Sequence, residues 1–151
     1  MANNQIEEEI EPRIIETLDD ALEELSFDTN QQVRVLRTHD DREVIIIQPN
    51  AFTISRIYAT GRPDGQRPQG FESYHSHLYE KLDTYERQNG SDEGFGMETE
   101  EWQTLFDECY DRYIRYLLFA GIKRWAAVKQ DTDQNLGVAD MAYKYASPEI
   151  T

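Results

Sequence analysis

Hydrophobic side chains recur at helical intervals near the beginning of the chain. They are Ile6, Ile10, Ile14, Leu18, Leu22 and Leu25, which follow one another in steps of four residues and one last step of three. This spacing places them along one face of an α-helix. The segment also contains many glutamates, and acids in a first helical turn are favoured by the helix dipole. We therefore predict an acidic amphipathic helix within residues 1–28.

The pattern changes to β-branched runs in the next part of the chain. Val33 and Leu36 precede a polar cluster at residues 39–42, and an uninterrupted apolar run follows at residues 44–47. Two such runs around a polar turn are typical of a β-hairpin. The longer apolar run indicates that the second strand is the more buried. We predict this hairpin over residues 31–48.

Residues 51–60 fit two kinds of element. Asn50 is suited to begin a helix and Gly61 to end it, and we slightly prefer this helical interpretation. A third strand is the alternative, because apolar and polar side chains also alternate here. The alternating positions are Phe52, Ile54, Arg56 and Tyr58.

Helical spacing returns in the second half of the chain. Ser73 is suited to cap a helix that ends at Gly90. The strongest periodicity runs through residues 99–146 and predicts two antiparallel helices that turn at Gly121. Gly137 lies inside the second of them, where glycine costs about 1 kcal/mol relative to alanine. A break near this glycine is therefore an alternative.

These elements together predict a single α+β domain over residues 1–151 that is predominantly helical. It consists of an N-terminal helix, a small β-hairpin, and three or four helices that end in an antiparallel helical hairpin. The length of 151 residues agrees with one domain. The chain has no apolar run long enough to span a membrane and no secretory signal pattern, and its one cysteine excludes an internal disulfide. We therefore expect a cytoplasmic protein without a membrane contact.

The net charge of −15 is unevenly distributed along the chain. Residues 1–28 carry −9 and residues 72–111 carry −10, whereas residues 29–71 and 112–151 carry +2 each. The simplest interpretation is a solvated acidic surface that the weakly basic segments partly compensate. Mimicry of a nucleic acid and adaptation to high salt are the alternatives. Direct nucleic-acid binding is not expected, because it requires clustered lysines and arginines.

Motifs for catalysis or metal binding are weak in this sequence. His75 and His77 are two residues apart and would point to different sides of a helix. Cys109 falls on the apolar side of its predicted helix, beside Phe106 and Tyr113, where a thiol usually packs. The nucleophile motif Gly-x-Ser-x-Gly does not occur. We expect no catalytic residue, no metal site and no cofactor, and hence no enzyme.

The loop at residues 61–70, rich in glycine, proline and arginine, is the candidate anion site. Arg62 and Arg67 lie in it and Arg56 precedes it, which groups three bases in an acidic chain. Guanidinium groups suit phosphate or carboxylate, and glycines let a ligand approach the backbone. The Gly-Lys-Ser/Thr ending of a nucleotide-binding P-loop is missing. In the alternative interpretation, the arginines clamp the loop to acids of residues 72–111 or cap helix ends.

Aromatic side chains are unusually dense in the last two predicted helices. Our candidate partner-binding residues are Tyr110, Tyr113, Tyr116 and Trp125, because tyrosine and tryptophan are enriched at interfaces. The alternative is an ordinary core whose tyrosine hydroxyls reach solvent.

These observations favour a non-enzymatic protein that binds another protein, or a second copy of itself, as an adaptor or a structural component of an assembly. The aromatic face of the C-terminal helices and the arginine-bearing loop would make the contact. One alternative is an acidic inhibitor that mimics a nucleic acid and occupies a basic protein. Another is a sensor or enzyme for a small anion, centred on Arg62 and Arg67.

Overall fold

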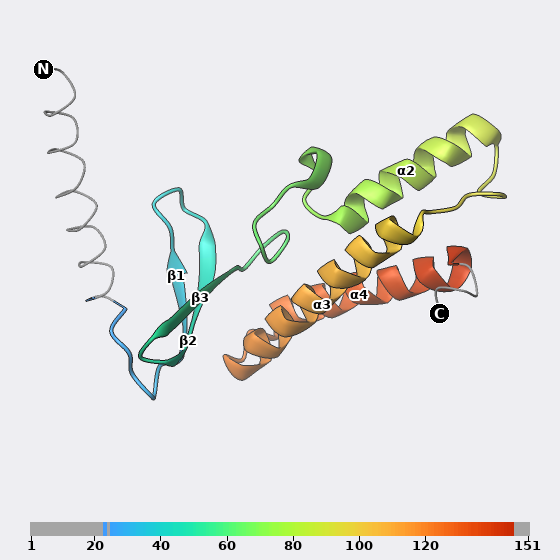
Figure 1. The fold of residues 1–151 in the computed structure, drawn as a ribbon. Coiled ribbons are helices and arrows are strands. Elements are labelled where there is room, and N and C mark those ends of the chain that lie inside the picture. Colours follow the sequence, from blue (N-terminus) through green and yellow to red (C-terminus); the bar gives the residue numbers. More distant parts are fainter. Residues whose placement is uncertain (1–22, 24, 147–151) are drawn as a thin grey trace, which may run out of the picture.

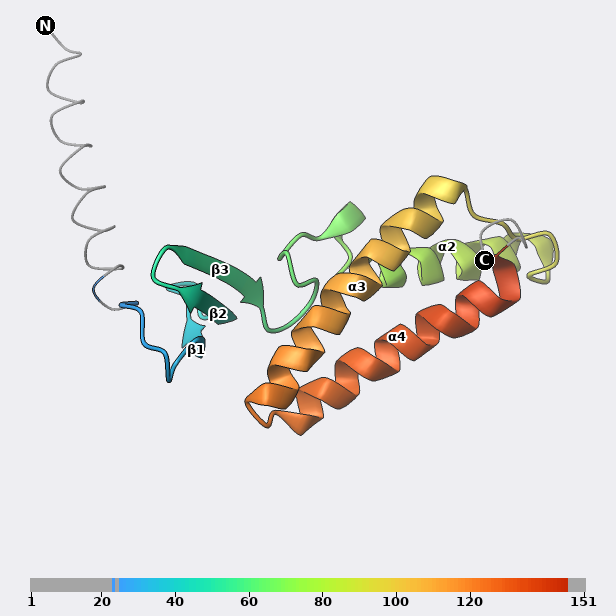
Figure 2. The same cartoon turned by 60° about the horizontal axis from the view of Figure 1, so that its bottom comes forward.

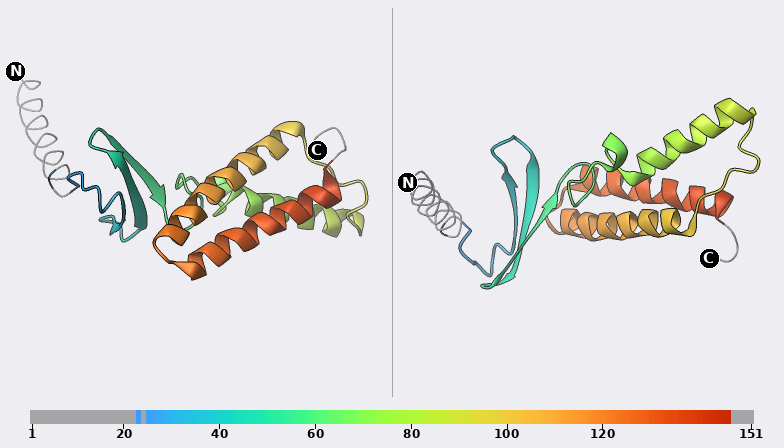
Figure 3. Two further views of the ribbon diagram at one scale, coloured as in Figure 1. Left: turned by 90° about the horizontal axis from the view of Figure 1, so that it is seen from below. Right: turned by 45° about the horizontal axis from the view of Figure 1, so that its top comes forward.

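The computed structural model describes residue 23 and residues 25–146, and it shows a mixed α+β fold in which about half of these residues are helical. The elements are β1 (Val33–Arg37), β2 (Glu43–Asn50), β3 (Thr53–Tyr58), the 3-10 helix η1 (Pro68–Gly70), α2 (Tyr74–Asn89), α3 (Thr99–Gly121) and α4 (Trp125–Tyr145) (Figure 1). The sheet lies at one end of the described part, and the three helices extend away from it (Figure 3). Most of the acidic helix predicted within residues 1–28 lies outside the described residues.

The strands form one antiparallel sheet in the order β1-β2-β3. The hairpin predicted over residues 31–48 is present as β1 and β2, and β2 is the more buried strand. The preference for a helix over residues 51–60 is wrong, because this segment contains β3. Asn50 explains the difference: its Oδ1 accepts the backbone N–H of Phe52 in a tight turn that leads directly into β3.

The predicted boundaries of α2 agree with the structure. The Ser73 hydroxyl accepts the backbone N–H of Ser76, and Gly90 ends the helix with a left-handed φ of 80°. The break considered near Gly137 does not occur, since α4 is continuous from Trp125 to Tyr145. A Cβ atom at Gly137 would lie 3.1 Å from Cε1 of His75 on α2. This glycine therefore makes room for a neighbouring helix.

α3 and α4 lie side by side and run in opposite directions (Figure 2). α3 begins with a capping box, in which Glu98 and Glu101 each accept the other's backbone N–H. Residues 122–124 join the two helices, and Lys123 takes a left-handed φ of 61°. The turn thus follows directly after Gly121.

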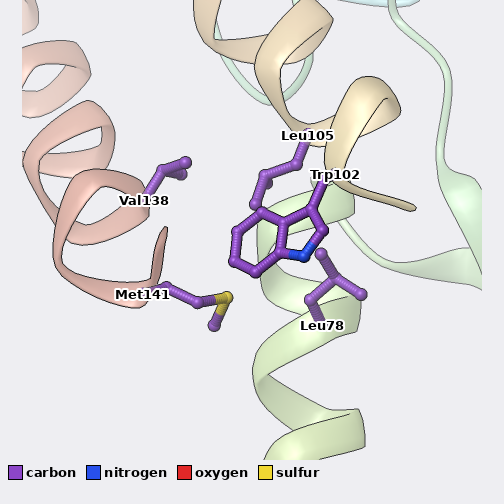
Figure 4. Close-up of a cluster of buried hydrophobic side chains, with 5 residues drawn as sticks. All are labelled: Leu78, Trp102, Leu105, Val138 and Met141. Atoms are coloured by element: carbon purple, nitrogen blue, oxygen red, sulfur yellow. The ribbon is translucent and has the colours of Figure 1, made fainter. Parts of the chain in front are cut away.

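Two hydrophobic cores hold the elements together. The first joins the three helices through Leu78 of α2, Trp102 and Leu105 of α3, and Val138 and Met141 of α4 (Figure 4). The second joins the sheet to the α3–α4 turn and contains Ile45, Ala59 and Phe119. Along α3 the two cores are separated by more than two helical turns, and this interval carries the groups described next.

Candidate functional site

The inward face of α3 is charged between the two cores. Glu108, Arg112 and Arg115 are each at most 2% exposed. Their spacing of four and three residues places them on one side of the helix. Buried charges are costly unless they are paired and hydrogen-bonded. Their partners therefore decide what this part of the structure does.

Arg115 joins three parts of the chain. Its Nε and Nη2 donate to the two carboxylate oxygens of Asp131 on α4, at 2.8 and 2.6 Å. Its Nη1 donates to the carbonyl oxygens of Tyr58 and Gly61, at 2.9 and 2.8 Å. The guanidinium thus fixes the end of β3 and the beginning of the 61–70 loop to the helical hairpin.

Glu108 plays a similar role for α2. Its carboxylate accepts the backbone N–H groups of Tyr74 and His75 at 2.7 and 3.3 Å, and it pairs with Arg112 Nη2 at 2.6 Å. A negative charge is favourable at a helix N-terminus, where N–H groups lack helical partners. Arg112 also donates to Oδ1 of Asn135 on α4 at 2.7 Å. One buried ion pair therefore connects the three helices.

Two ionisable side chains beside this network have shifted pKa values. Burial, and next the positive charge of Arg112, lower the pKa of His75 to about 4, against the opposite influence of Glu108. His75 is therefore neutral at pH 7. Burial also raises the pKa of the Cys109 thiol, which disfavours the thiolate needed for nucleophilic attack. These features fit a structural clamp, and they give no support to an activated nucleophile.

The outward face of α3 carries apolar side chains that the rest of the described chain leaves uncovered. This aromatic stripe consists of Phe106, Tyr110, Tyr113 and Leu117, which are 37%, 63%, 41% and 48% exposed. Steps of four, three and four residues align them along the helix. Phe106 and Tyr113, which flank Cys109 on the apolar side predicted from the sequence, are exposed, whereas Cys109 itself is partly buried against the first core. The buried charges of the same helix occupy the inward side instead.

The four candidate partner-binding residues do not form one group. Tyr110 and Tyr113 lie in the aromatic stripe with their rings 6.2 Å apart. Tyr116 is half-buried, and its ring meets that of Tyr113 edge-on at 5.2 Å. Trp125 is 63% exposed but belongs to the first turn of α4. The stripe on α3 is thus the continuous part of the candidate contact surface.

The three candidate anion-binding arginines are also divided. Arg62 and Arg67 line one surface hollow of about 300 Å³, whereas Arg56 lines another with Asp64 and Asp111. Arg62 pairs with Asp64 at 2.7 Å and lies 3.5 Å from Glu108. The clamp interpretation therefore describes Arg62, but not Arg67.

Arg42 was not identified from the sequence, although it lines the same hollow as Arg62 and Arg67. It precedes β2, and its guanidinium carbon lies 3.8 Å from the centre of the Tyr58 ring on β3. Strand pairing brings it next to a loop that follows in sequence about twenty residues later. We call this site, with Arg42, Arg62 and Arg67, the arginine hollow.

Within residues 25–146, no three histidine, cysteine, aspartate or glutamate side chains are placed to hold a metal ion. The helices in this described part are all too short or too polar to cross a membrane. Comparisons of the chain with protein-family models, with curated proteins and with solved structures gave no match.

Proposed function

We propose that this chain is a non-enzymatic protein-binding module, an adaptor or assembly component, whose contact surface is the aromatic stripe of α3. The carrying observation is the exposure of four aligned apolar side chains on a helix that buries three charged residues, Glu108, Arg112 and Arg115, on its other face. Fully burying such a side chain contributes about 1.5–3 kcal/mol, and part of this remains ungained within the described part of the chain. An exposed apolar surface of this kind is typical of an interaction site.

Charge at the edge of the stripe indicates the chemistry of the partner. Glu100, Asp107 and Asp111 are exposed on α3, and none of them forms an ion pair with a residue that the structure describes. Both bases of α3, Arg112 and Arg115, are buried on the other face. The exposed charge of this helix is therefore entirely negative. A basic partner would supply the missing counter-charges.

The spacing of the stripe indicates the shape of that partner. Apolar residues in alternating steps of three and four form the seam along which two helices pack. We therefore commit to one occupant: a short amphipathic helix of another protein, with an apolar seam and lysines or arginines beside it. A second copy of this chain is a poorer occupant, because it would bring a net charge of −15 and the same unpaired acids to the contact.

The test uses the full chain and two synthetic amphipathic peptides. The peptides share a leucine seam, and one has lysines where the other has glutamates. Fluorescence anisotropy should show binding of the lysine peptide to the native chain. The double variant Tyr110→Ser/Tyr113→Ser should bind it at least ~10-fold more weakly, as expected for central aromatic contacts. The variant Tyr143→Ser is the matched control, because Tyr143 is 95% exposed but lies on α4.

Three results would contradict the proposal. Equal binding of both peptides would show hydrophobic adhesion without charge selection. Equal weakening by Tyr143→Ser would show that any exposed ring suffices. A native mass twice that of the chain, reduced to one chain by the double variant, would assign the stripe to self-association. Circular dichroism of each variant confirms that the fold is retained.

A further inference from the structure

The arginine hollow contains bases that have no carboxylate partner among residues 25–146, although acidic residues outnumber basic ones by 30 to 15 in the sequence. Nine lysines or arginines form ion pairs in the described part of the chain. Arg42 and Arg67 form none there, and both line this one hollow. Two unpaired guanidinium groups at one site create a local positive charge in an otherwise acidic protein.

Tyr58 organises the hollow from the sheet. Its ring lies under the guanidinium of Arg42, an arrangement in which the cation is attracted to the ring face. Gly65 of the loop lies against the same ring: a Cβ atom there would come within 2.3 Å of Cε2 of Tyr58, and the φ of this glycine is +76°. The backbone N–H of Tyr58 donates to the carbonyl oxygen of Pro63 at 2.9 Å. Sheet and loop are thus held in register.

The loop itself is fixed before any ligand arrives. Arg62 forms two hydrogen bonds with the carboxylate of Asp64, at 3.0 and 2.7 Å. Arg115 of α3 donates to the carbonyl oxygen of Gly61 at 2.8 Å. Arg67 donates to the carbonyl oxygen of Gly70 at 3.2 Å, which uses one of its five N–H groups. The remaining donors of Arg67 have no acceptor among the described residues, so they can bind an anion in a site that needs little rearrangement.

The chemistry of the lining favours a phosphate group. Guanidinium groups bind phosphate through two parallel hydrogen bonds, and the unpaired charge of Arg42 and Arg67 matches a dianion. Glu72 also lines the hollow and opposes an anion, but its side chain is exposed. A volume of about 300 Å³ lies at the lower limit of small-molecule sites. We propose that the arginine hollow binds the phosphate group of a small molecule through Arg42 and Arg67.

Isothermal titration calorimetry of the full chain at low ionic strength tests this proposal with pyrophosphate, inorganic phosphate and acetate. Both phosphates should bind, pyrophosphate more tightly, and acetate should bind at least ~10-fold more weakly. Arg42→Gln and Arg67→Gln should each weaken phosphate binding by about 10-fold, as expected for a charge-assisted hydrogen bond. Glu72→Gln should tighten binding by several-fold. Arg56→Gln is the matched control, since Arg56 also lies over Tyr58 but lines another hollow.

A second measurement does not depend on any variant. Pyrophosphate should shift the backbone amide resonances of Gly61 and Gly65, and leave those of α4 beyond Asp131 unchanged. Absence of binding by both phosphates, or equal weakening by Arg56→Gln, would overturn the site. Equal affinity for acetate would overturn the phosphate class. Much tighter binding of a phosphoserine peptide than of pyrophosphate would overturn the small-molecule assignment.

Discussion

The two faces of α3 reverse the usual amphipathic arrangement over the middle of the helix. The inward face carries Glu108, Arg112 and Arg115, whereas the outward face carries Tyr110 and Tyr113. Each buried charge reaches at least one other element, as Arg115 does with Asp131 on α4 and with the end of β3. The exposed rings contact their neighbours on α3. The inward face of α3 therefore stabilises the fold, and the outward face remains exposed.

The energetic reason for this division is that hydrogen bonds are directional and hydrophobic contacts are not. A buried guanidinium loses much solvation free energy, and this loss is offset only when its donors meet acceptors in fixed positions. Arg115 meets four such acceptor atoms. It therefore specifies how the sheet, the loop and α4 are placed. The exposed rings of Tyr110 and Tyr113 fix no other element of the described part, and their exposed apolar area is what the proposed partner would cover.

The largest effect is expected when the Arg115 pair is broken on one side. Arg115→Met leaves the Asp131 carboxylate buried without a counter-charge and removes the bonds to the carbonyl oxygens of Tyr58 and Gly61. We expect the free energy of unfolding, measured by urea denaturation, to fall by about 3–5 kcal/mol. Arg124→Met is the matched control. Arg124 pairs with Glu43 near the surface, and its loss should cost about 0–1 kcal/mol.

A double variant that removes both Arg115 and Asp131 tests whether the loss comes from an unpaired buried charge. Arg115→Met combined with Asp131→Leu should recover a large part of the stability lost by the single variant, because no unpaired charge is left buried. A single variant that loses less than the Arg124→Met control would show that Arg115 does not hold the elements together.

The second effect compares neighbouring acids on the two faces of α3. Glu108→Gln weakens the bonds to the N-terminus of α2 and leaves Arg112 without a counter-charge, so we expect a loss of roughly 2–3 kcal/mol in urea denaturation. Asp107→Asn changes an exposed acid one residue earlier and should stay within about 0.5 kcal/mol of the native chain. Equal effects of the two substitutions would mean that the inward and outward faces of α3 contribute equally to the free energy of unfolding.

The sequence predicted those parts of the fold that local pattern determines. The hairpin at residues 31–48 and the limits of α2 at Ser73 and Gly90 follow from alternation and from capping residues. The helix prediction for residues 51–60 was wrong because the apolar positions of this segment fit both the helical and the strand periodicity. Pairing with β2 across the tight turn at Asn50 decides in favour of a strand there.

The buried charges on the inward face of α3 could not be predicted from the sequence. Apolar periodicity marks one side of a helix, and the usual inference is that this side faces the core. Arg112 and Arg115 occupy the inward side because their partners lie far away in sequence, on α4 and at the end of β3. Arg42 could not be predicted as a member of the arginine hollow either, since only strand pairing brings it beside the 61–70 loop. Side chains whose partners are distant carry no local signal.

A smaller effect concerns the protonation of His75. Its pKa is about 4 in the folded chain and about 6.5 in an unfolded one, so the unfolded chain binds the extra proton between these values. The unfolded chain is therefore favoured as the pH falls. The stability that the folded chain gains from a neutral His75 is fully present above pH 6.5 and is lost as the pH falls toward 4. Urea denaturation should show a decrease of about 1–2 kcal/mol between pH 7 and pH 5 that depends on this residue, after allowance for partial solvent screening.

The variant His75→Phe separates this contribution from that of the carboxyl groups. It should remove most of the pH dependence between pH 5 and pH 6.5, whereas His39→Asn, which changes an exposed histidine in the β1–β2 turn, should retain it. The same slope in the His75→Phe variant as in the native chain would contradict a neutral, buried His75 beside Arg112 and Glu108.

The smallest effect on stability is expected at the exposed rings, and it separates a contact surface from a core most directly. Tyr110→Ser should change the free energy of unfolding by no more than about 0.5 kcal/mol, because the ring is 63% exposed. Leu105→Ala, on the inward face of the same helix, should cost about 2–5 kcal/mol as a cavity forms among the core side chains. If Tyr110→Ser instead cost as much as Leu105→Ala, the outward face of α3 would be part of the folded core. The stripe would then have no free apolar area to offer a partner.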